Sequence, residues 1–215
     1  MHIIDDRVNI TEQGRKIAER NRKMFDGHGV TAVNVMGAIG SGKTIMIERL
    51  VQALGQDVRI AAIAGDVVSD MDAGRIAKTG ISAIGVNTGR ECHLDAHMIE
   101  HAAEKIDLQN TDLLLVENVG NLVCPADFEL GTHKNVVVVS TSEGDDIVKK
   151  HPMIFLISDL CVINKIDIAE AVGADAEKME ADAKTINPNI EVLRVSFKTG
   201  KNVQELAAWM KSLLS

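Results

Sequence analysis

A glycine-rich loop at residues 37–44 has the composition and spacing of a phosphate-binding loop. Its glycines allow a tight turn in which backbone amides approach a polyphosphate, and Lys43 adds positive charge beside them. Thr44 then offers its hydroxyl group to a phosphate-bound Mg²⁺ ion. The loop stands between an apolar, strand-like run and a helix-like segment, which is the context that this motif requires. We therefore expect nucleotide contacts from Gly37, Ile39, Gly40, Ser41, Gly42, Lys43 and Thr44.

Two carboxylates are placed to share that Mg²⁺ ion. Glu117 ends the apolar run 113–117 and is followed, after two residues, by Gly120 in the position of a glycine that senses the γ-phosphate. Asp66 ends another strand-like run, so it should reach the metal or orient water. The structural alternative for Asp66, and still more for Asp72, is a helix N-cap. The residues expected to carry the chemistry are Lys43, Thr44, Asp66 and Glu117, of which the last three would hold Mg²⁺.

The motif at residues 164–167 favours guanine over adenine. Asn164, Lys165 and Asp167 match the N-K-x-D element of GTP-binding proteins and follow a strand-like run. The Asp167 carboxylate can accept hydrogen bonds from the guanine N1–H and exocyclic amine, which adenine cannot return. A buried carboxylate left without those donors is costly, so the motif discriminates between the bases. Lys165 would lie along the base and ribose.

A weaker signal for the same base follows the last strand-like run. Ser196, Phe197 and Lys198 are similar to the S-A-K element, in which a backbone N–H meets the guanine O6. Phe197 replaces the usual alanine, and this change leaves the backbone contact possible but alters the packing of the loop.

The residue after the sensing glycine is Asn121, where Ras-like proteins carry a water-orienting glutamine. Hydrolysis of GTP to GDP and phosphate would then rest on Lys43, Mg²⁺ and positioning alone. We expect a slow intrinsic rate that depends on dimerisation or on a partner.

Cys92, His93 and Cys124 form a candidate site for a second metal. Thiolate and imidazole ligands suit Ni²⁺ or Zn²⁺ and not Mg²⁺. Three ligands do not close a tetrahedral site, so this set is either open for exchange or completed by a second chain. The residues flank segments that should touch the γ-phosphate region, so the nucleotide state should alter metal affinity. Cys161 lies within an apolar run and is typical of a buried small hydrophobe.

Histidines 93, 97 and 101 recur at intervals of four residues. If the helix begins near residue 91, they line one of its faces and form a path for metal transfer. Such a row is more commonly a solvated or partner-facing surface, and whether His97 or His101 takes part in metal transfer stays open.

The elements that must position these residues are seven strand-like runs that alternate with helical patterns. They span residues 32–36, 58–64, 82–86, 113–117, 136–140, 160–164 and 191–196. Several runs are apolar on both faces, which predicts a mainly parallel sheet flanked by helices, the three-layer α/β P-loop NTPase architecture. Residues 1–28 form a separate helical segment that packs on or docks to a nucleotide-binding domain at 29–215.

Composition narrows the class of protein further. The formal charge of −8 disfavours a broad nucleic-acid surface, because phosphate neutralisation requires clustered Lys and Arg. The sequence contains no apolar stretch of membrane-spanning length, and it begins without a secretory signal. Three cysteines are too few, and odd in number, for a disulfide framework. We expect a cytoplasmic protein that binds neither nucleic acid nor membrane.

With these residues assembled, the chain resembles the HypB family of hydrogenase maturation GTPases, in particular an archaeal short form. The most specific stretches are residues 37–44, 87–97, 117–124 and 164–167. The resemblance implies a SIMIBI-class GTPase that forms a GTP- or metal-dependent homodimer. It also implies nickel delivery to the [NiFe]-hydrogenase large-subunit precursor, together with the small metallochaperone HypA. The metal site of this family maps onto Cys92, His93 and Cys124.

Three alternatives remain distinct from this interpretation. A urease-type nickel-insertion GTPase would carry Cys-Pro-His, whereas here Cys92-His93 and Cys124-Pro125 are separate. A non-catalytic, metal-dependent dimerisation scaffold would use the nucleotide only for structure. A P-loop kinase is disfavoured by residues 164–167. The sequence does not decide between Ni²⁺ and Zn²⁺, because both accept imidazole and thiolate.

Overall fold

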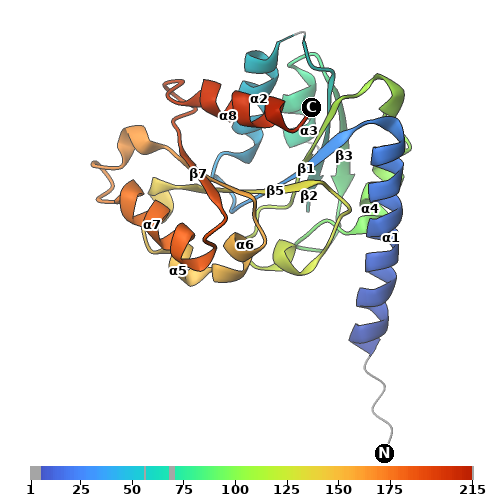
Figure 1. Ribbon diagram of the computed structural model, residues 1–215, viewed down its shortest axis with the longest axis horizontal. Coiled ribbons are helices and arrows are strands. Elements are labelled where there is room, and N and C mark those ends of the chain that lie inside the picture. The colour runs from blue at the N-terminus through green and yellow to red at the C-terminus, as the bar shows by residue number, and fades with distance from the viewer. Residues whose placement is uncertain (1–5, 56, 68–70, 215) are drawn as a thin grey trace, which may run out of the picture.

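A computed structural model describes residues 6–55, 57–67 and 71–214, in which strands and helices alternate (Figure 1). The strands are β1 (Thr31–Met36), β2 (Ile60–Asp66), β3 (Ser82–Asn87), β4 (Leu113–Glu117), β5 (Lys134–Ser140), β6 (Leu160–Asn164) and β7 (Glu191–Arg194). The α-helices are α1 (Asp6–His28), α2 (Lys43–Leu54), α3 (Met71–Ala77), α4 (Ala96–Ala103), α5 (Ile147–Lys150), α6 (Pro152–Leu156), α7 (Ala176–Ile186) and α8 (Val203–Ser212). Short 3₁₀ turns lie at η1 (Leu108–Asn110), η2 (Cys124–Asp127), η3 (Thr141–Glu143) and η4 (Ile166–Ile168).

The strands form one sheet in the order β3-β2-β4-β1-β5-β6-β7, and every neighbouring pair is parallel. The predicted three-layer α/β fold is therefore confirmed. In a parallel sheet all strands end at the same edge, so the loops after β1, β2, β4, β6 and β7 meet there. Those loops contain the motifs that the sequence suggested for chemistry.

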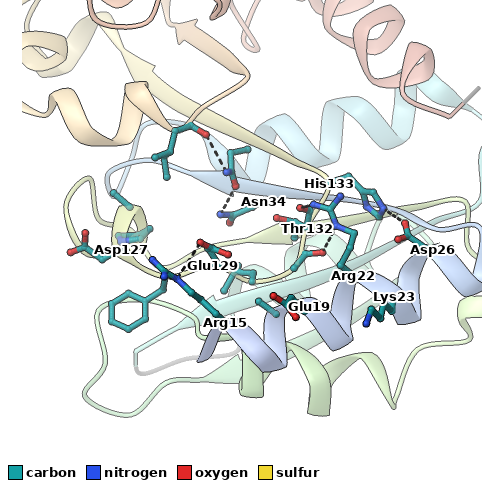
Figure 2. Close-up of a pocket in the computed structure, with 18 residues that line it drawn as sticks. Arg15, Glu19, Arg22, Lys23, Asp26, Asn34, Asp127, Glu129, Thr132 and His133 are labelled. Carbon is teal, nitrogen blue, oxygen red and sulfur yellow. Dashed lines mark hydrogen bonds and ion pairs between the residues drawn. The ribbon is translucent and has the colours of Figure 1, made fainter. Parts of the chain in front are cut away.

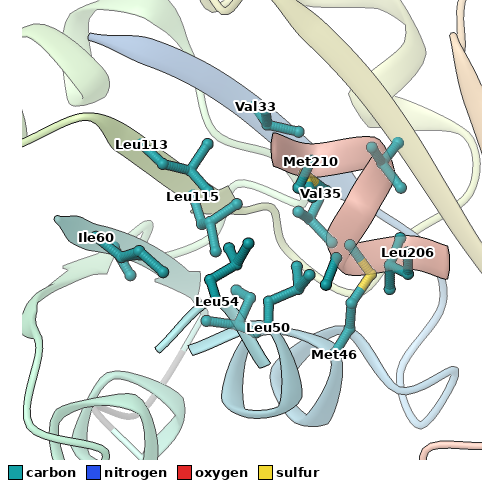
Figure 3. Close-up of a cluster of buried hydrophobic side chains, with 14 of the residues drawn as sticks. Val33, Val35, Met46, Leu50, Leu54, Ile60, Leu113, Leu115, Leu206 and Met210 are labelled. Atoms are coloured by element: carbon teal, nitrogen blue, oxygen red, sulfur yellow. The ribbon is translucent and has the colours of Figure 1, made fainter. Parts of the chain in front are cut away.

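Alternation along β1 explains why both faces of the sheet are covered. Val33 and Val35 pack against side chains of α2 and α8 on one face (Figure 3). Ala32 belongs to the cluster under α1 and α4, and Met36 to the cluster beside α5, α6 and α7. Because side chains alternate with a period of two, a strand buried on both faces must be apolar throughout, as the sequence of β1 nearly is. Its one buried polar residue is Asn34, which is 2% exposed.

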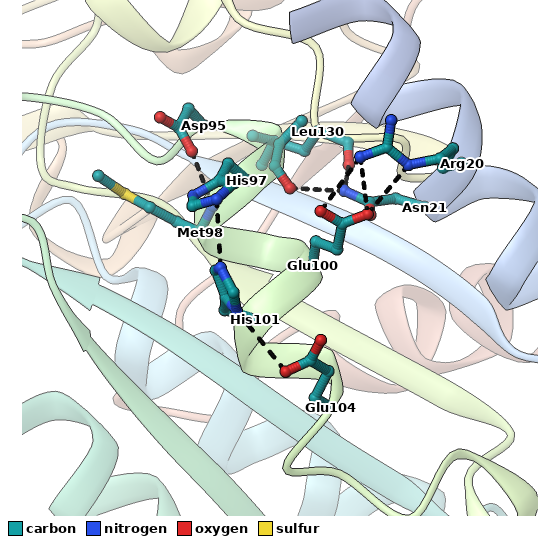
Figure 4. A network of polar contacts seen from close by, with 10 residues as sticks. Arg20, Asn21, Asp95, His97, Met98, Glu100, His101, Glu104 and Leu130 are labelled. Atoms are coloured by element: carbon teal, nitrogen blue, oxygen red, sulfur yellow. Dashed lines mark hydrogen bonds and ion pairs between the residues drawn. The ribbon is translucent and has the colours of Figure 1, made fainter.

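The N-terminal helix α1 lies across α4, as Figure 4 shows at close range. The buried amide of Asn21 donates hydrogen bonds to the carbonyl oxygens of Ala96, at 2.8 Å, and Leu130, at 3.0 Å. Arg20 adds an ion pair with Glu100 on the rim of this contact. Among the described residues, no helix combines the length and the apolar character needed to cross a membrane.

We predict that Gly131→Ala weakens the attachment of α1. Gly131 has φ +86°, and an added Cβ would collide with the Ala18 carbonyl oxygen of α1. The free energy of unfolding should fall by ~2–4 kcal/mol, which combines left-handed strain with overpacking. Gly173→Ala is the matched control, since Gly173 has φ +67° but open space around it. Urea unfolding that shows equal losses for both variants would contradict the steric argument.

Candidate functional site

A cavity of about 790 Å³ opens at the carboxyl edge of the sheet. It brings together most of the residues that the sequence suggested for nucleotide and Mg²⁺ binding. The predicted residues that line it are Ile39, Gly40, Gly42, Lys43, Thr44, Asp66, Glu117, Gly120, Asn164, Lys165, Asp167, Phe197 and Lys198. Gly37, Ser41 and Ser196 do not line the cavity, and the side chains of Ser41 and Ser196 are fully buried.

The loop between β1 and α2 packs tightly against its neighbours. Gly42 has φ +112°, and a Cβ there would collide with the side-chain amide of Asn164. Gly120 lies against Ile39 at the tip of the loop, where its own Cβ would collide with the isoleucine side chain. Gly37 also forms an antiparallel bridge with Asn121. The candidate phosphate-sensing segment is thus in direct contact with the candidate phosphate-binding loop.

Lys43 is held inside this loop. Its Nζ donates hydrogen bonds to the carbonyl oxygens of Gly37 and Ala38, each at 3.1 Å. Burial lowers the pKa of Lys43, and the nearby Glu117 carboxylate opposes that change. The ammonium group therefore lies beside the position where the loop would receive an anion.

Thr44, Glu117 and Asp72 form an oxygen-rich cluster at the start of α2. The Thr44 hydroxyl lies 2.8 Å from Glu117 Oε1 and 3.1 Å from Asp72 Oδ1, and its single proton serves one acceptor at a time. Glu117 is 3% exposed, and its Oε2 has no hydrogen-bond partner among the described residues. This burial raises the pKa of Glu117 to about 7. A divalent cation that prefers oxygen ligands fits this set, because it would satisfy the second oxygen in place of a proton.

Asp72 was not expected in this cluster, because its sequence position is equally typical of a helix N-cap. It is instead the second residue of α3 and is directed at Thr44. Arg75, one helical turn later, pairs with Glu48 of α2 and holds α3 against that helix. Asp66 lines the same cavity from the end of β2, as expected.

Asn164 joins the three segments expected to surround the nucleotide. Its Nδ2 donates to the Ser41 carbonyl oxygen at 2.9 Å, and its Oδ1 accepts from the backbone N–H groups of Lys165 and Phe197. The side chain is 3% exposed. Asn164 therefore fixes the relative positions of the loops, and in this structure its polar atoms are engaged by the protein.

Asp167 faces the cavity with its carboxylate held in place. Its Oδ1 accepts a hydrogen bond of 2.6 Å from the Ser196 hydroxyl. The Phe197 ring is 1% exposed and belongs to the core below α8, which explains how the loop accommodates a residue bulkier than alanine. Its backbone N–H, which the sequence suggested for guanine O6, is 3.3 Å from Asn164 Oδ1.

The candidate soft-metal residues do not line this cavity, and Cys124 lies four residues after Gly120, which does. Interaction with the Cys124 thiol, followed by burial, raises the pKa of Cys92. Cys92 Sγ is 3.9 Å from His93 Nδ1, and the His93 ring stacks on Phe128 with a centroid distance of 3.5 Å. Within the part of the chain that the structure describes, no three His, Cys, Asp or Glu side chains are arranged to hold a metal ion. The predicted ligands are neighbours, but they do not form a closed site in one chain.

The predicted row of three histidines is wrong. Helix α4 begins at Ala96, where the Asp95 side chain caps it by accepting from the Met98 N–H at 2.7 Å. His93 therefore precedes the helix and turns into the protein, where it is 8% exposed. Only His97 and His101 share the helix face, with their Nε2 atoms 3.2 Å apart (Figure 4).

Two asparagines beside the candidate γ-phosphate sensor also contact the metal segments, and no sequence pattern indicated either contact. Asn121 Nδ2 lies 3.3 Å from Cys124 Sγ, and its Oδ1 accepts from the Val123 N–H. Asn118 is 1% exposed, and its Oδ1 accepts from the Leu94 N–H, directly after His93.

A second cavity of about 850 Å³ lies between α1 and residues 125–133 (Figure 2). Phe128 lines it and also stacks on His93, so this cavity lies directly behind the candidate metal segment. Arg22 spans its wall by donating to the carbonyl oxygens of Gly131 and Thr132.

The parallel sheet and the glycine-rich loop after β1 define a P-loop nucleotide-binding domain. A family model described as "CobW/HypB/UreG, nucleotide-binding domain" matches residues 31–194. The chain is 55% identical over 197 residues to the probable hydrogenase maturation factor HypB of Methanocaldococcus jannaschii, covering 92% of this chain and 89% of that protein.

Two solved structures are similar over nearly the whole chain. The crystal structure of HypB from Archaeoglobus fulgidus superposes with a TM-score of 0.89 at 52% identity, covering 95% of this chain and 100% of that one. The structure of HypB from Helicobacter pylori in complex with nickel gives a TM-score of 0.89 at 33% identity, covering 94% and 95%. The chain belongs to the CobW/HypB/UreG family and, within it, to the hydrogenase maturation factors HypB.

We predict that Glu117→Gln changes how stability depends on pH in the nucleotide-free protein. The folded-state pKa of Glu117 is raised from 4.5 to about 7, so the folded protein holds an extra proton between these values. The contribution of this group to stability is therefore present at low pH and is lost as pH rises towards 7. The loss amounts to about 3 kcal/mol, which the amide variant avoids.

Urea unfolding at about pH 5 and about pH 8 measures the effect, because the advantage of the variant over wild type should grow across that interval. Glu205→Gln, which changes an exposed carboxylate on α8, is the control. A constant difference between Glu117→Gln and wild type at both pH values would be inconsistent with a raised pKa.

Proposed function

We propose that this chain is a GTPase whose nucleotide state controls a bound metal ion during nickel insertion into a [NiFe]-hydrogenase precursor. The observation that carries the proposal is the contact between the two candidate sites. Gly120 packs on Ile39 of the phosphate loop, and the Nδ2 of the next residue, Asn121, lies 3.3 Å from Cys124 Sγ. A nucleotide that moves residue 120 thereby moves a metal ligand.

On the nucleotide side, Lys43 and the loop amides bind the phosphates, and Asp167 selects guanine. Mg²⁺, held by Thr44, Glu117 and Asp66, neutralises charge on the phosphates when it is bound. Asn121 is turned towards Cys124 and away from the role of a water-orienting glutamine. This arrangement supports slow hydrolysis of GTP to GDP and phosphate, with stimulation by dimerisation or a partner.

On the metal side, the cargo is Ni²⁺, with Zn²⁺ as the competing ion of similar ligand preference. The nickel complex of the Helicobacter pylori relative supports this assignment. Cys92, His93 and Cys124 supply thiolate and imidazole, and the incomplete set is consistent with ligands from a second copy. Large apolar side chains are exposed at Ile39 and Val123, close to both sites, which supports a homodimer that covers them.

Loading and release of the nickel ion imply two protein partners. A HypA-like metallochaperone exchanges nickel with the open site, and the hydrogenase large-subunit precursor receives the ion. These events take place in the cytoplasm.

We predict that Asp167→Ala lowers the affinity for GDP by ~10–100-fold, because guanine loses hydrogen bonds to a charged group. The affinity for ADP should stay at its low wild-type value. Titration calorimetry with both nucleotides measures this. Asp175→Ala is the control, since Asp175 caps α7 outside the cavity. A parallel loss for GDP and ADP would show that the carboxylate supports the loop and does not read the base.

We predict that nickel affinity differs at least ~5-fold between the GDP-bound protein and the protein bound to a non-hydrolysable GTP analogue. Cys92→Ala should lower nickel affinity in both states, whereas Cys161→Ala, which changes a fully buried thiol in β6, should leave it unchanged. Competition with a chromophoric chelator measures the affinities. Equal nickel affinity in the two nucleotide states would remove the switch from the proposal.

A further inference from the structure

A chain of side-chain amides runs behind the two candidate sites. Asn135 Nδ2 donates to the Ile157 carbonyl oxygen at 3.2 Å, and Asn34 Nδ2 donates to Asn135 Oδ1 at 3.1 Å. Asn118 Nδ2 in turn donates to Asn34 Oδ1 at 3.1 Å. Asn118 directly follows β4, and the others lie on the adjacent strands β1 and β5. Asn34 is directed towards the cavity beside α1 (Figure 2).

The chain of amides ends at a single oxygen atom that holds both functional segments. Asn118 Oδ1 accepts the Leu94 N–H at 3.0 Å and the Val119 N–H at 2.9 Å. Leu94 directly follows His93, and Val119 directly precedes Gly120. Because Asn118 Nδ2 donates to Asn34 Oδ1, the amide is held at its other end, and its oxygen cannot follow one segment without disturbing its bond to the other.

Because the hydrogen bonds to Asn118 are buried, the loss of either one is costly. Asn118 is 1% exposed, and its bonds to the Leu94 and Val119 N–H groups are buried, so no solvent replaces a lost partner there. A buried N–H group without an acceptor costs about 1–3 kcal/mol, so a movement of Val119 must be accommodated at Leu94. The Leu94 side chain is itself fully buried and packs against Gly65, beside Asp66. The segment that holds His93 is therefore braced against the ends of both β4 and β2.

We propose that Asn118 is the positioning residue through which the nucleotide state reaches His93 and hence the metal site. This inference rests on the proposed function, in which nucleotide and metal affinities are linked. When the segment at Gly120 moves, the Val119 N–H changes its distance to the shared oxygen. The Leu94 N–H then readjusts, and the imidazole of His93 moves with it.

The test measures the coupling factor, which is the ratio of nickel affinities with GDP and with a non-hydrolysable GTP analogue. Asn118→Ala should bring this ratio to within ~2-fold of one, from a wild-type ratio of at least ~5. Asn118→Asp keeps an acceptor for both N–H groups but loses the donor to Asn34 Oδ1, so it should retain part of the coupling. Asn187→Ala is the matched control, because it removes an amide that donates to three carbonyl oxygens near α6. It should leave the ratio unchanged.

The outcomes separate this inference from the function on which it rests. A wild-type ratio of one overturns both. A normal wild-type ratio that persists in Asn118→Ala overturns only the role of Asn118, as does equal loss in the alanine and aspartate variants, which would indicate packing.

Hydrogen exchange of the wild-type protein keeps the inference testable if Asn118→Ala does not fold. The exchange rate of the Leu94 amide should differ between the two nucleotide states, together with that of Val119. An unchanged Leu94 rate, with a changed Val119 rate, would show that the shared oxygen does not transmit the movement.

Discussion

The position of β1 between β4 and β5 is the constraint on which the site depends. Parallel pairing on both sides makes the chain leave β1 at the same edge as the ends of its two neighbours. Since both faces of the strand are packed against helices, β1 cannot slip by one residue without moving apolar side chains out of the core. The start of the phosphate loop and the position of Glu117 at the end of β4 are therefore fixed relative to each other.

Buried charge is the cost of this arrangement. Lys43 and Glu117 are both enclosed at the end of the sheet. Burial lowers the pKa of Lys43 and raises the pKa of Glu117, and both changes favour the neutral form. Glu117 Oε2 and Ser41 Oγ are buried and have no hydrogen-bond partner among the described residues. The ligand-free site therefore holds polar atoms at a free-energy penalty, which a bound anion and cation would reduce. The same few side chains therefore favour binding of such ligands and lower the stability of the domain without them.

The sequence predicted the features that depend on local spacing and on alternation. The seven strands were predicted because apolar runs separated by helical patterns have few other solutions, and the residues expected around the cavity meet because parallel strands end together. Features that depend on the path of a loop were not predicted. The helical period could not show that Asp95 caps α4 and leaves His93 outside it. The spacing of the histidines is the same whether the helix begins before His93 or after it. Nor could it show that Asp72 turns towards Thr44.

The asparagines illustrate a further limit. Asn164 belongs to a motif, and its place at the cavity was expected, but its role as a joint between three loops depends on atoms far apart in the chain. Asn34 belongs to no motif, and Asn118 lies within the stretch 117–124, where the motif gave it no role of its own. A single polar residue in an apolar strand marks a buried amide that needs partners, and only the tertiary structure identifies which ones.

The enclosure of Cys161 in β6 has a practical meaning for chemistry on this protein. Its thiol is fully buried, and that burial raises its pKa well above the usual range. A thiol without access or thiolate character reacts slowly with alkylating reagents. In the folded protein, maleimide modification should therefore report on Cys92 and Cys124, with little labelling of Cys161.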